Sequence, residues 1–395
     1  MTQRTSGMWT IQMPGGVSPP EPPPRERVYP LAPLLRPPRY VIYVANREGQ
    51  FIGELTPWGY LESAPAAMDS YTTTALHLSP GARRAAARLL DHGNLVLVVF
   101  DNGYPMWGGV IDPPHEGAAD ASRITLYSGE YLLSWYKTPF ERPYPVVYRY
   151  EYPAVILSDL VEKATYDGLR MLPPAENRAE GERITTSFGL QTVLSAAGHL
   201  LSRAPDMHWR ARPVMRSDRS GFDFQLEIFH GTWRDRTAGV ALVRGVNFVE
   251  VQFISEGPIV NWLSVDMPNQ TGDELSYIVL VEDESSAPVY GRRWGPRTVT
   301  DEEAAVDLPF ERMVEEAQKI AAAEFARTTR PARRVRGKHL NVPPARYGSF
   351  GVGDLITVEL GELEGVYTAQ GLVTVLQYDP AAGMAEVVVE LQRQQ

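Results

Sequence analysis

From Arg39 onwards the chain is a succession of short apolar or alternating runs separated by turn residues. Residues 40–46 (YVIYVAN), 94–100, 104–111 and 122–128 are expected strands, and Asp101-Asn102-Gly103 between two of them predicts a hairpin. In residues 222–228 apolar side chains alternate with Asp223, Gln225 and Glu227, which predicts a strand with one buried and one solvated face. A chain built from so many short strands is expected to be mainly β.

Helical spacing interrupts this β pattern at four places. In residues 190–201 the apolar residues recur with the i, i+3, i+4, i+7 spacing of a helix, from Leu190 to Leu201. Residues 154–166 and 308–327 are also expected helices, and a short one should run from Ser79 to Gly93. Further strands are expected at 51–55, 70–78, 246–254, 259–266, 275–281, 332–340, 355–360, 366–377 and 384–392.

Composition narrows the function classes. The chain has 395 residues, 44% of them hydrophobic, so it can bury sizeable cores in several domains. The net charge of −10 argues against nucleic acid or an anionic membrane as a ligand. The absence of cysteine excludes disulfides, thiolate metal sites and cysteine nucleophiles. No apolar run reaches the ~20 residues of a membrane helix, and the N-terminus lacks the pattern of a secretory signal.

The N-terminal segment, residues 1–38, is expected to be an arm. Ten prolines fall between Pro14 and Pro38, and such a stretch favours an extended polyproline II path. It is either a plain tail or an arm that docks on a neighbouring subunit. In the second case its apolar anchors would be Tyr29, Leu31, Leu34 and Leu35.

The remaining pattern divides into a compact, mostly antiparallel β domain over residues 39–135 and an α+β domain over 136–243. After these, strands return over 244–300, a helical segment occupies 301–342, and strands close the chain over 343–395.

No catalytic constellation emerges from the sequence. There is no HExxH helix, no GxSxG elbow and no phosphate-binding loop. His115-Glu116 falls in a Pro/Gly loop, and the GSFGVGD run at 348–354 is followed by a strand rather than a helix, so it is expected to be a turn. We therefore expect no enzyme activity, no metal and no cofactor.

A basic stretch, residues 330–338 (RPARRVRGK), stands out in an acidic chain. One interpretation is a solvated strand edge, because charged edges block aggregation. The other is an electrostatic contact between subunits, carried by Arg330, Arg333, Arg334 and Arg336.

The order of these signals resembles the tail hub (baseplate hub) proteins of long-tailed bacteriophages. The first domain carries most of the resemblance, in YVIYVANREGQFIGEL, in residues 70–112 and in SRITLYSGEYLLSW. The matching positions there are Leu89, Leu90, Gly93, Gly109, Ile111, Gly129 and Leu133. Later ones are a strand with Trp209 after the helix at 190–201, the run Asn261–Val265, and Gly353, Asp354 and Val358 after the long helix.

The resemblance implies a structural protein. Two β-barrel-like domains of the tail-tube type, residues 39–135 and 244–300 with 343–395, would form the ring of a homotrimer, and residues 136–243 and 301–342 would decorate it. Such a hub continues and terminates the tail tube, joins the tube to a tip fibre or spike, and lines the channel for DNA and the tape-measure protein.

The implied partners are further copies of the chain, a distal tail ring or tail-tube protein, the tape-measure protein, and a fibre or spike protein. The implied location is the virion tail tip, after synthesis in the host cytoplasm. Because the chain ends directly after a strand, a separate protein is expected to supply any fibre or hydrolase. An acidic lumen would let DNA pass without binding it.

Three alternatives stay open. Another tail-tip ring protein, such as the distal tail protein, would form a hexamer. A carbohydrate-binding adhesion module could use some of the eight tryptophans. A β-rich carbohydrate-active enzyme would need two carboxylates about 5–10 Å apart.

Overall fold

The computed structural model describes residues 40–392 with gaps at 57–58, 80–81, 83–85, 101–102, 113–122, 139–145, 167, 169, 176–178, 257–259, 268–276, 283, 285–287, 289–290, 299–309, 329–331, 362–366 and 380–381. The proline-rich segment, with Tyr29, Leu31, Leu34 and Leu35, lies outside the described residues, as do Arg330 and the His115-Glu116 pair. Every element below belongs to the unit of residues 32–395.

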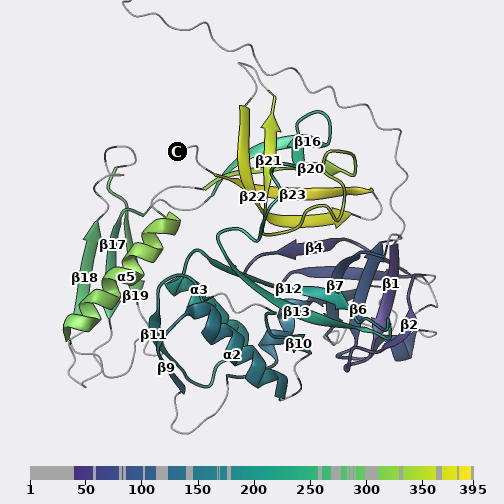
Figure 1. Ribbon diagram of the computed structural model, residues 1–395, viewed down its shortest axis with the longest axis horizontal. Coiled ribbons are helices and arrows are strands. Elements are labelled where there is room, and N and C mark those ends of the chain that lie inside the picture. The colour runs from purple at the N-terminus through teal and green to yellow at the C-terminus, as the bar shows by residue number, and fades with distance from the viewer. Residues whose placement is uncertain are drawn as a thin grey trace, which may run out of the picture. The chain divides into compact units, whose positions relative to one another are not determined.

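Seven strands form the first large sheet, in the order β2-β1-β6-β7-β8-β5-β3 (Figure 1). Their bounds are β1 Tyr40–Ala45, β2 Phe51–Glu54, β3 Gly59–Leu61, β5 Thr73–Leu78, β6 Leu95–Phe100, β7 Pro105–Ile111 and β8 Arg123–Ser128. The predicted hairpin is confirmed: β6 and β7 are antiparallel, and Gly103 in their turn has φ +81°. That backbone conformation favours glycine.

The second large sheet follows the order β14-β21-β22-β23-β20-β16, with β15 parallel to β21 and β4 antiparallel to the end of β22. The bounds are β4 Ala64–Ala67, β14 Arg234–Asp235, β15 Ala241–Val243, β16 Phe248–Glu256, β20 Ala332–Leu340, β21 Asp354–Leu360, β22 Tyr367–Asp379 and β23 Met384–Leu391. Neither order returns to its first strand. In the described part of the chain both sheets are therefore open, and the closed form of a β-barrel is not seen.

An α+β region follows the first sheet. Its elements are η2 Gly129–Ser134, β9 Val146–Glu151, α2 Pro153–Tyr166, β10 Met171–Leu172, β11 Ile184–Phe188, α3 Val193–Arg203, β12 Met207–Met215 and β13 Phe222–His230. The α3 helix begins later than predicted because the side chain of Thr192 caps it, accepting a hydrogen bond from the Ser195 amide at 3.1 Å. Leu190, which was predicted on its apolar face, lies before the helix and is 57% exposed.

A third sheet, β18-β17-β19, packs against the long helix (Figure 1). The bounds are β17 Trp262–Met267, β18 Tyr277–Glu282, β19 Trp294–Thr298 and α5 Phe310–Thr328. Leu263 and Val265 meet Ala317, Ile320 and Ala321 in a small core, and the predicted helix at 308–327 is confirmed.

Sheet membership differs from the predicted ranges in several places. Strands β17–β19 form their own sheet with α5, although residues 244–300 were expected in the second barrel. Strand β20, expected in the bracing segment 301–342, lies inside the second sheet, and β14 and β15 leave the α+β range to pair with β21. The short helix expected after Ser79 is represented among the described residues by Ala82 and the 3-10 turn η1 Ala87–Leu90.

The first sheet is buried on both faces, and this explains its apolar runs. Along β6, Val96 and Val98 belong to a core shared with the second sheet, whereas Leu95 and Leu97 belong to a core shared with α2, α3, β12 and β13. All six residues of β6 are buried. A strand with a core on each face has no solvent-exposed face for polar side chains, so its residues are apolar throughout.

Candidate functional site

The predicted basic stretch is paired within the chain. Arg334 contacts Glu390 at 3.2 Å, Arg336 contacts Glu386 at 2.5 Å and Lys338 contacts Glu250 at 2.6 Å. These acids lie on the strands at either side, because β20 is hydrogen-bonded to both β16 and β23. The edge-strand interpretation is therefore wrong. The proposed contact of Arg330, Arg333, Arg334 and Arg336 with another subunit stays a prediction, and of the described members Arg333 is exposed without a pair named above.

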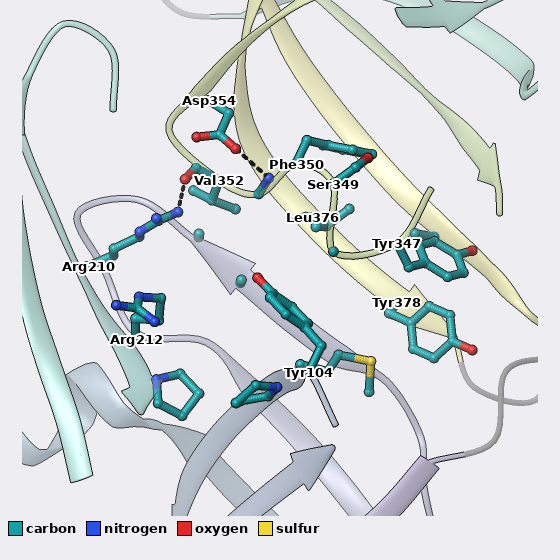
Figure 2. Close-up of a pocket in the computed structure, with 18 of the residues that line it drawn as sticks. Tyr104, Arg210, Arg212, Tyr347, Ser349, Phe350, Val352, Asp354, Leu376 and Tyr378 are labelled. Carbon is teal, nitrogen blue, oxygen red and sulfur yellow. Dashed lines mark hydrogen bonds between the residues drawn. The ribbon is translucent and has the colours of Figure 1, made fainter. Parts of the chain in front are cut away.

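The site that the described residues do form lies where the two large sheets meet the α+β region. A cavity of about 190 Å³ opens there, lined by β4, the β6–β7 turn, β12, β22 and the turn that precedes β21 (Figure 2). Aromatic side chains line one part, among them Tyr104, Tyr347 and Tyr378, and Arg210, Arg212 and Asp354 line another.

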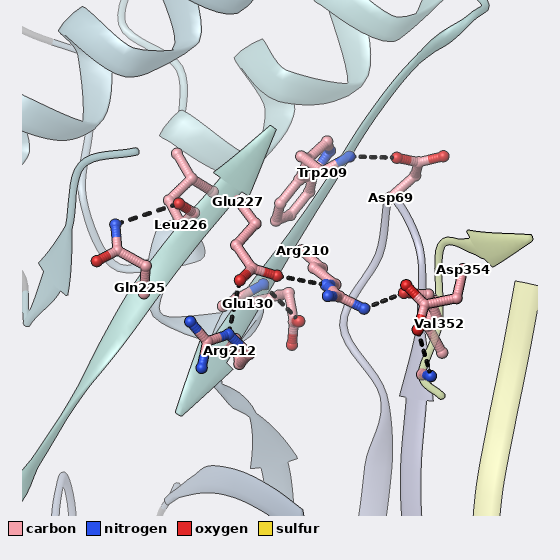
Figure 3. A network of polar contacts seen from close by, with 12 residues as sticks. Asp69, Glu130, Trp209, Arg210, Arg212, Gln225, Leu226, Glu227, Val352 and Asp354 are labelled. Atoms are coloured by element: carbon pink, nitrogen blue, oxygen red, sulfur yellow. Dashed lines mark hydrogen bonds and ion pairs between the residues drawn. The ribbon is translucent and has the colours of Figure 1, made fainter. Parts of the chain in front are cut away.

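A buried ion-pair cluster lies beside this cavity (Figure 3). The Glu227 carboxylate accepts a hydrogen bond from Arg210 Nε at 2.7 Å and another from Arg212 Nε at 2.6 Å. Strands β12 and β13 place these groups together, since Arg210 and Glu227 are register partners. Glu227 is only 4% exposed, so the expectation that this face of β13 is solvated is wrong at this residue. Burial of the carboxylate requires both guanidinium groups as partners.

Strand β12 is also held by carboxylates from other elements. Asp69, in the turn after β4, accepts from the Trp209 amide at 2.9 Å and contacts His208 Nδ1 at 2.7 Å. Glu130, in η2, accepts from the Ala211 amide at 2.8 Å. Together with Glu227, these contacts engage every residue from His208 to Arg212, so β12 is the strand on which the three parts converge.

Arg210 extends the cluster to the second sheet. It donates a hydrogen bond to the carbonyl of Val352, in the turn before β21 (Figure 3). In the same turn Asp354 Oδ2 accepts from the Gly351 amide at 3.0 Å, and Gly353 has φ +87°. The GSFGVGD run is thus the turn that the sequence predicted, and it connects the second sheet to β12. We call Asp69, Glu130, Arg210, Arg212, Glu227 and Asp354 the junction network.

Burial raises the pKa of Glu130 and of Asp354, because a low-dielectric environment disfavours their charged forms. Both carboxyl groups nonetheless accept backbone hydrogen bonds that hold strands in place. The network therefore has a structural role, which is to hold the surrounding strands and turns together. Among the described residues no group of three or more His, Cys, Asp or Glu could hold a metal ion. No helix in the described ranges is long and apolar enough to cross a membrane.

The sequence indicated only Asp354 of this network, through the Gly-Asp pair ahead of a strand. The other members lie in four separate segments. Arg210, Arg212 and Glu227 have one sequence signal, which is charge inside a strand, whereas Asp69 and Glu130 lie outside strands and have none.

His339 predicts a pH dependence of stability. It is fully buried on β20, where Nε2 lies 2.7 Å from the Ala345 carbonyl, and burial lowers its pKa from 6.5 to about 4. Between those values the unfolded chain binds a proton that the folded chain does not, so stability present at neutral pH is lost as the pH falls through this window. The loss should be about 3 kcal/mol.

Urea denaturation at pH 7 and pH 4 checks this. The matched variant His339→Gln keeps an N–H for Ala345 but does not titrate, so it should lack this part of the loss. Equal losses in the two proteins would contradict the assignment.

Comparison with known proteins gives the fold. No protein-family model and no curated protein matches the chain. Among solved structures, the 43 kDa tail protein of prophage MuSo2 from Shewanella oneidensis has a TM-score of 0.51 and 13% identity, covering 90% of this chain and 98% of that one. Prophage tail protein gp18 from Listeria monocytogenes EGD-e has a TM-score of 0.50 and 12% identity, covering 90% and 95%. The fold is that of phage tail proteins.

This similarity spans nearly the whole of each chain. Sequence identity this low shows the shared fold alone.

Proposed function

We propose that the chain is the hub of a phage tail tip, with a structural and not a catalytic role. One observation carries the proposal: the similarity to phage tail proteins covers 90% of this chain and 98% of the Shewanella protein. The ordered motifs of the sequence, from Leu89 to Val358, agree with it. The hub would continue and terminate the tail tube and join it to a fibre or spike at the tip of the virion.

The packing suits a part that must stay rigid in an assembly. The first sheet shares one core with the second sheet and another with the α+β region. The junction network then links β12 to the turn before β21 of the second sheet through Arg210, and to η2, which directly follows β8 of the first sheet, through Glu130. We infer that the two large sheets take the ring-forming role of the tail-tube domains, and that α2, α3 and the α5 sheet brace them.

The proposed partners follow from this position. Neighbouring copies would contact the two large sheets and the exposed Arg333, and the distal tail ring or tube protein, the tape-measure protein and a fibre or spike would meet the ring faces. DNA would cross the lumen without specific binding, since a chain of net charge −10 offers no general attraction to a polyanion.

We expect three copies in the assembled ring. Native mass spectrometry of the purified assembly, with electron microscopy of virions as a second measurement, counts the subunits directly. Closed cyclic symmetry lets one chain type terminate a tube, and each permanent contact should bury more than about 1,000 Å².

Six copies would instead identify a distal tail ring protein, and a chain that stays monomeric at high concentration would refute a ring of either kind.

A further inference from the structure

A row of aromatic rings crosses the surface of the first sheet and η2. Tyr71, Tyr131, Trp135 and His92 follow one another with ring-centroid separations of 5.1, 6.1 and 5.3 Å. Tyr127 stacks on Tyr131 at 4.2 Å. We call these five residues the aromatic row.

The row is both exposed and fixed. Its ends are open: Tyr71 is 40% exposed, Trp135 is 36% exposed and the His92 side chain is 47% exposed. Its middle is anchored, because the Tyr131 hydroxyl donates to Asp112 at 2.8 Å and His92 Nδ1 lies 3.5 Å from the same carboxylate. Rings held in this way lose little conformational freedom when a partner binds.

We propose that the aromatic row binds the proline-rich segment, residues 14–38, of a neighbouring copy of the chain. Rows of tyrosine and tryptophan are the chemistry that recognises polyproline II segments, since prolines pack flat on the rings. One polyproline II turn advances about 9 Å. Each step of the row is shorter than this, so one or two turns of the segment cover it.

The length of the segment is sufficient to reach a neighbouring copy of the chain. The segment enters β1 at Tyr40, and the row lies near the other end of β1, where Arg47 donates to the His92 carbonyl at 2.8 Å. Its own row is thus about 20 Å away, the length of β1. As polyproline II, residues 14–38 span about 75 Å, whereas a compact unit of this size is about 50 Å across. The segment can therefore cross a whole subunit.

The experiment uses the full chain, which contains no cysteine of its own. Two single variants are made: Ala32→Cys in the segment, between the apolar Leu31 and Leu34, and Ser70→Cys, exposed beside Tyr71. The two proteins are mixed, allowed to assemble and oxidised. The matched control replaces the second variant with Ala322→Cys, an exposed position on α5.

We expect a covalent dimer of the two variants, formed about tenfold more than with the control, and a loss of about tenfold when Tyr71→Ala and Trp135→Ala are added. Equal yields with row and control, or cross-linking only within one chain when both cysteines are in the same molecule, would overturn the inference. The inference would also be overturned if a soluble oligosaccharide bound the aromatic row of the full chain without displacing the proline-rich segment.

The inference rests on the proposed assembly, and the two fail differently. An oligomer without this cross-link refutes the docking alone, whereas a monomer by native mass spectrometry refutes both.

Discussion

Replacing Glu227 with alanine should lower the free energy of unfolding by about 3–5 kcal/mol. The change removes the carboxylate that both Arg210 and Arg212 contact and leaves the Arg210 side chain, 13% exposed, without its counter-charge. A buried charge that loses its partner keeps its desolvation cost. Urea denaturation followed by circular dichroism measures the effect.

Two further variants make this result specific. Glu386→Ala also removes one acid of a cross-strand pair, but its partner Arg336 is half exposed, so the expected loss is only about 0–1 kcal/mol. The double variant Arg210→Met with Glu227→Leu removes both members of the buried pair and should recover most of the lost stability. A Glu227→Ala protein as stable as Glu386→Ala would show that the buried cluster contributes nothing.

The local elements could be predicted from the sequence because their signals are local. The hairpin at Gly103 follows from turn chemistry, and α5 follows from an apolar face with Ala317, Ile320 and Ala321 at helical spacing. Both depend on residues close together in the chain, and the structure places both as predicted.

The junction network could not be predicted because its contacts join distant segments. Alternation in β13 shows that Glu227 faces away from Phe224, but not what covers that face. Arg210 contacts Glu227 from the neighbouring strand β12, and the same side chain also reaches Val352, a residue 142 positions further along the chain. An alternating pattern distinguishes the two faces of a strand. It does not show which element packs on each face, because that is decided by residues far apart in the chain.

Sheet membership was missed for the same reason. Strand β4 follows β3 along the chain, yet it pairs with β22, more than 300 residues away. Strand β20 is rich in arginine, and one interpretation of the sequence placed it at an edge, yet it lies inside the sheet beside acids on β16 and β23. A charged strand can lie between two other strands of a sheet when those strands carry opposite charges close to it.

Replacing Gly129 with alanine should destabilise the chain by about 3 kcal/mol, the upper end of the usual cost of overpacking a core. A Cβ at this position would lie 2.3 Å from two ring carbons of Phe224 on β13. That ring cannot move aside easily, because Phe224 is fully buried and packs against Phe222 at 5.4 Å. The expected measurement is a shift of the urea midpoint to lower concentration.

Gly198→Ala is the matched control. Gly198 is an exposed residue of α3 with no atom within 4 Å of an added Cβ, so alanine should stabilise the helix by roughly 0.5–1 kcal/mol. Opposite signs for the same substitution would show that close packing, and not backbone entropy, requires glycine at 129. If Gly129→Ala instead left stability unchanged, the contact between η2 and β13 would be looser than the structure has it. The expected result would explain why the motif position 129 is a glycine. The Phe224 ring, which packs between the first sheet and the α+β region, leaves no room for a side chain there.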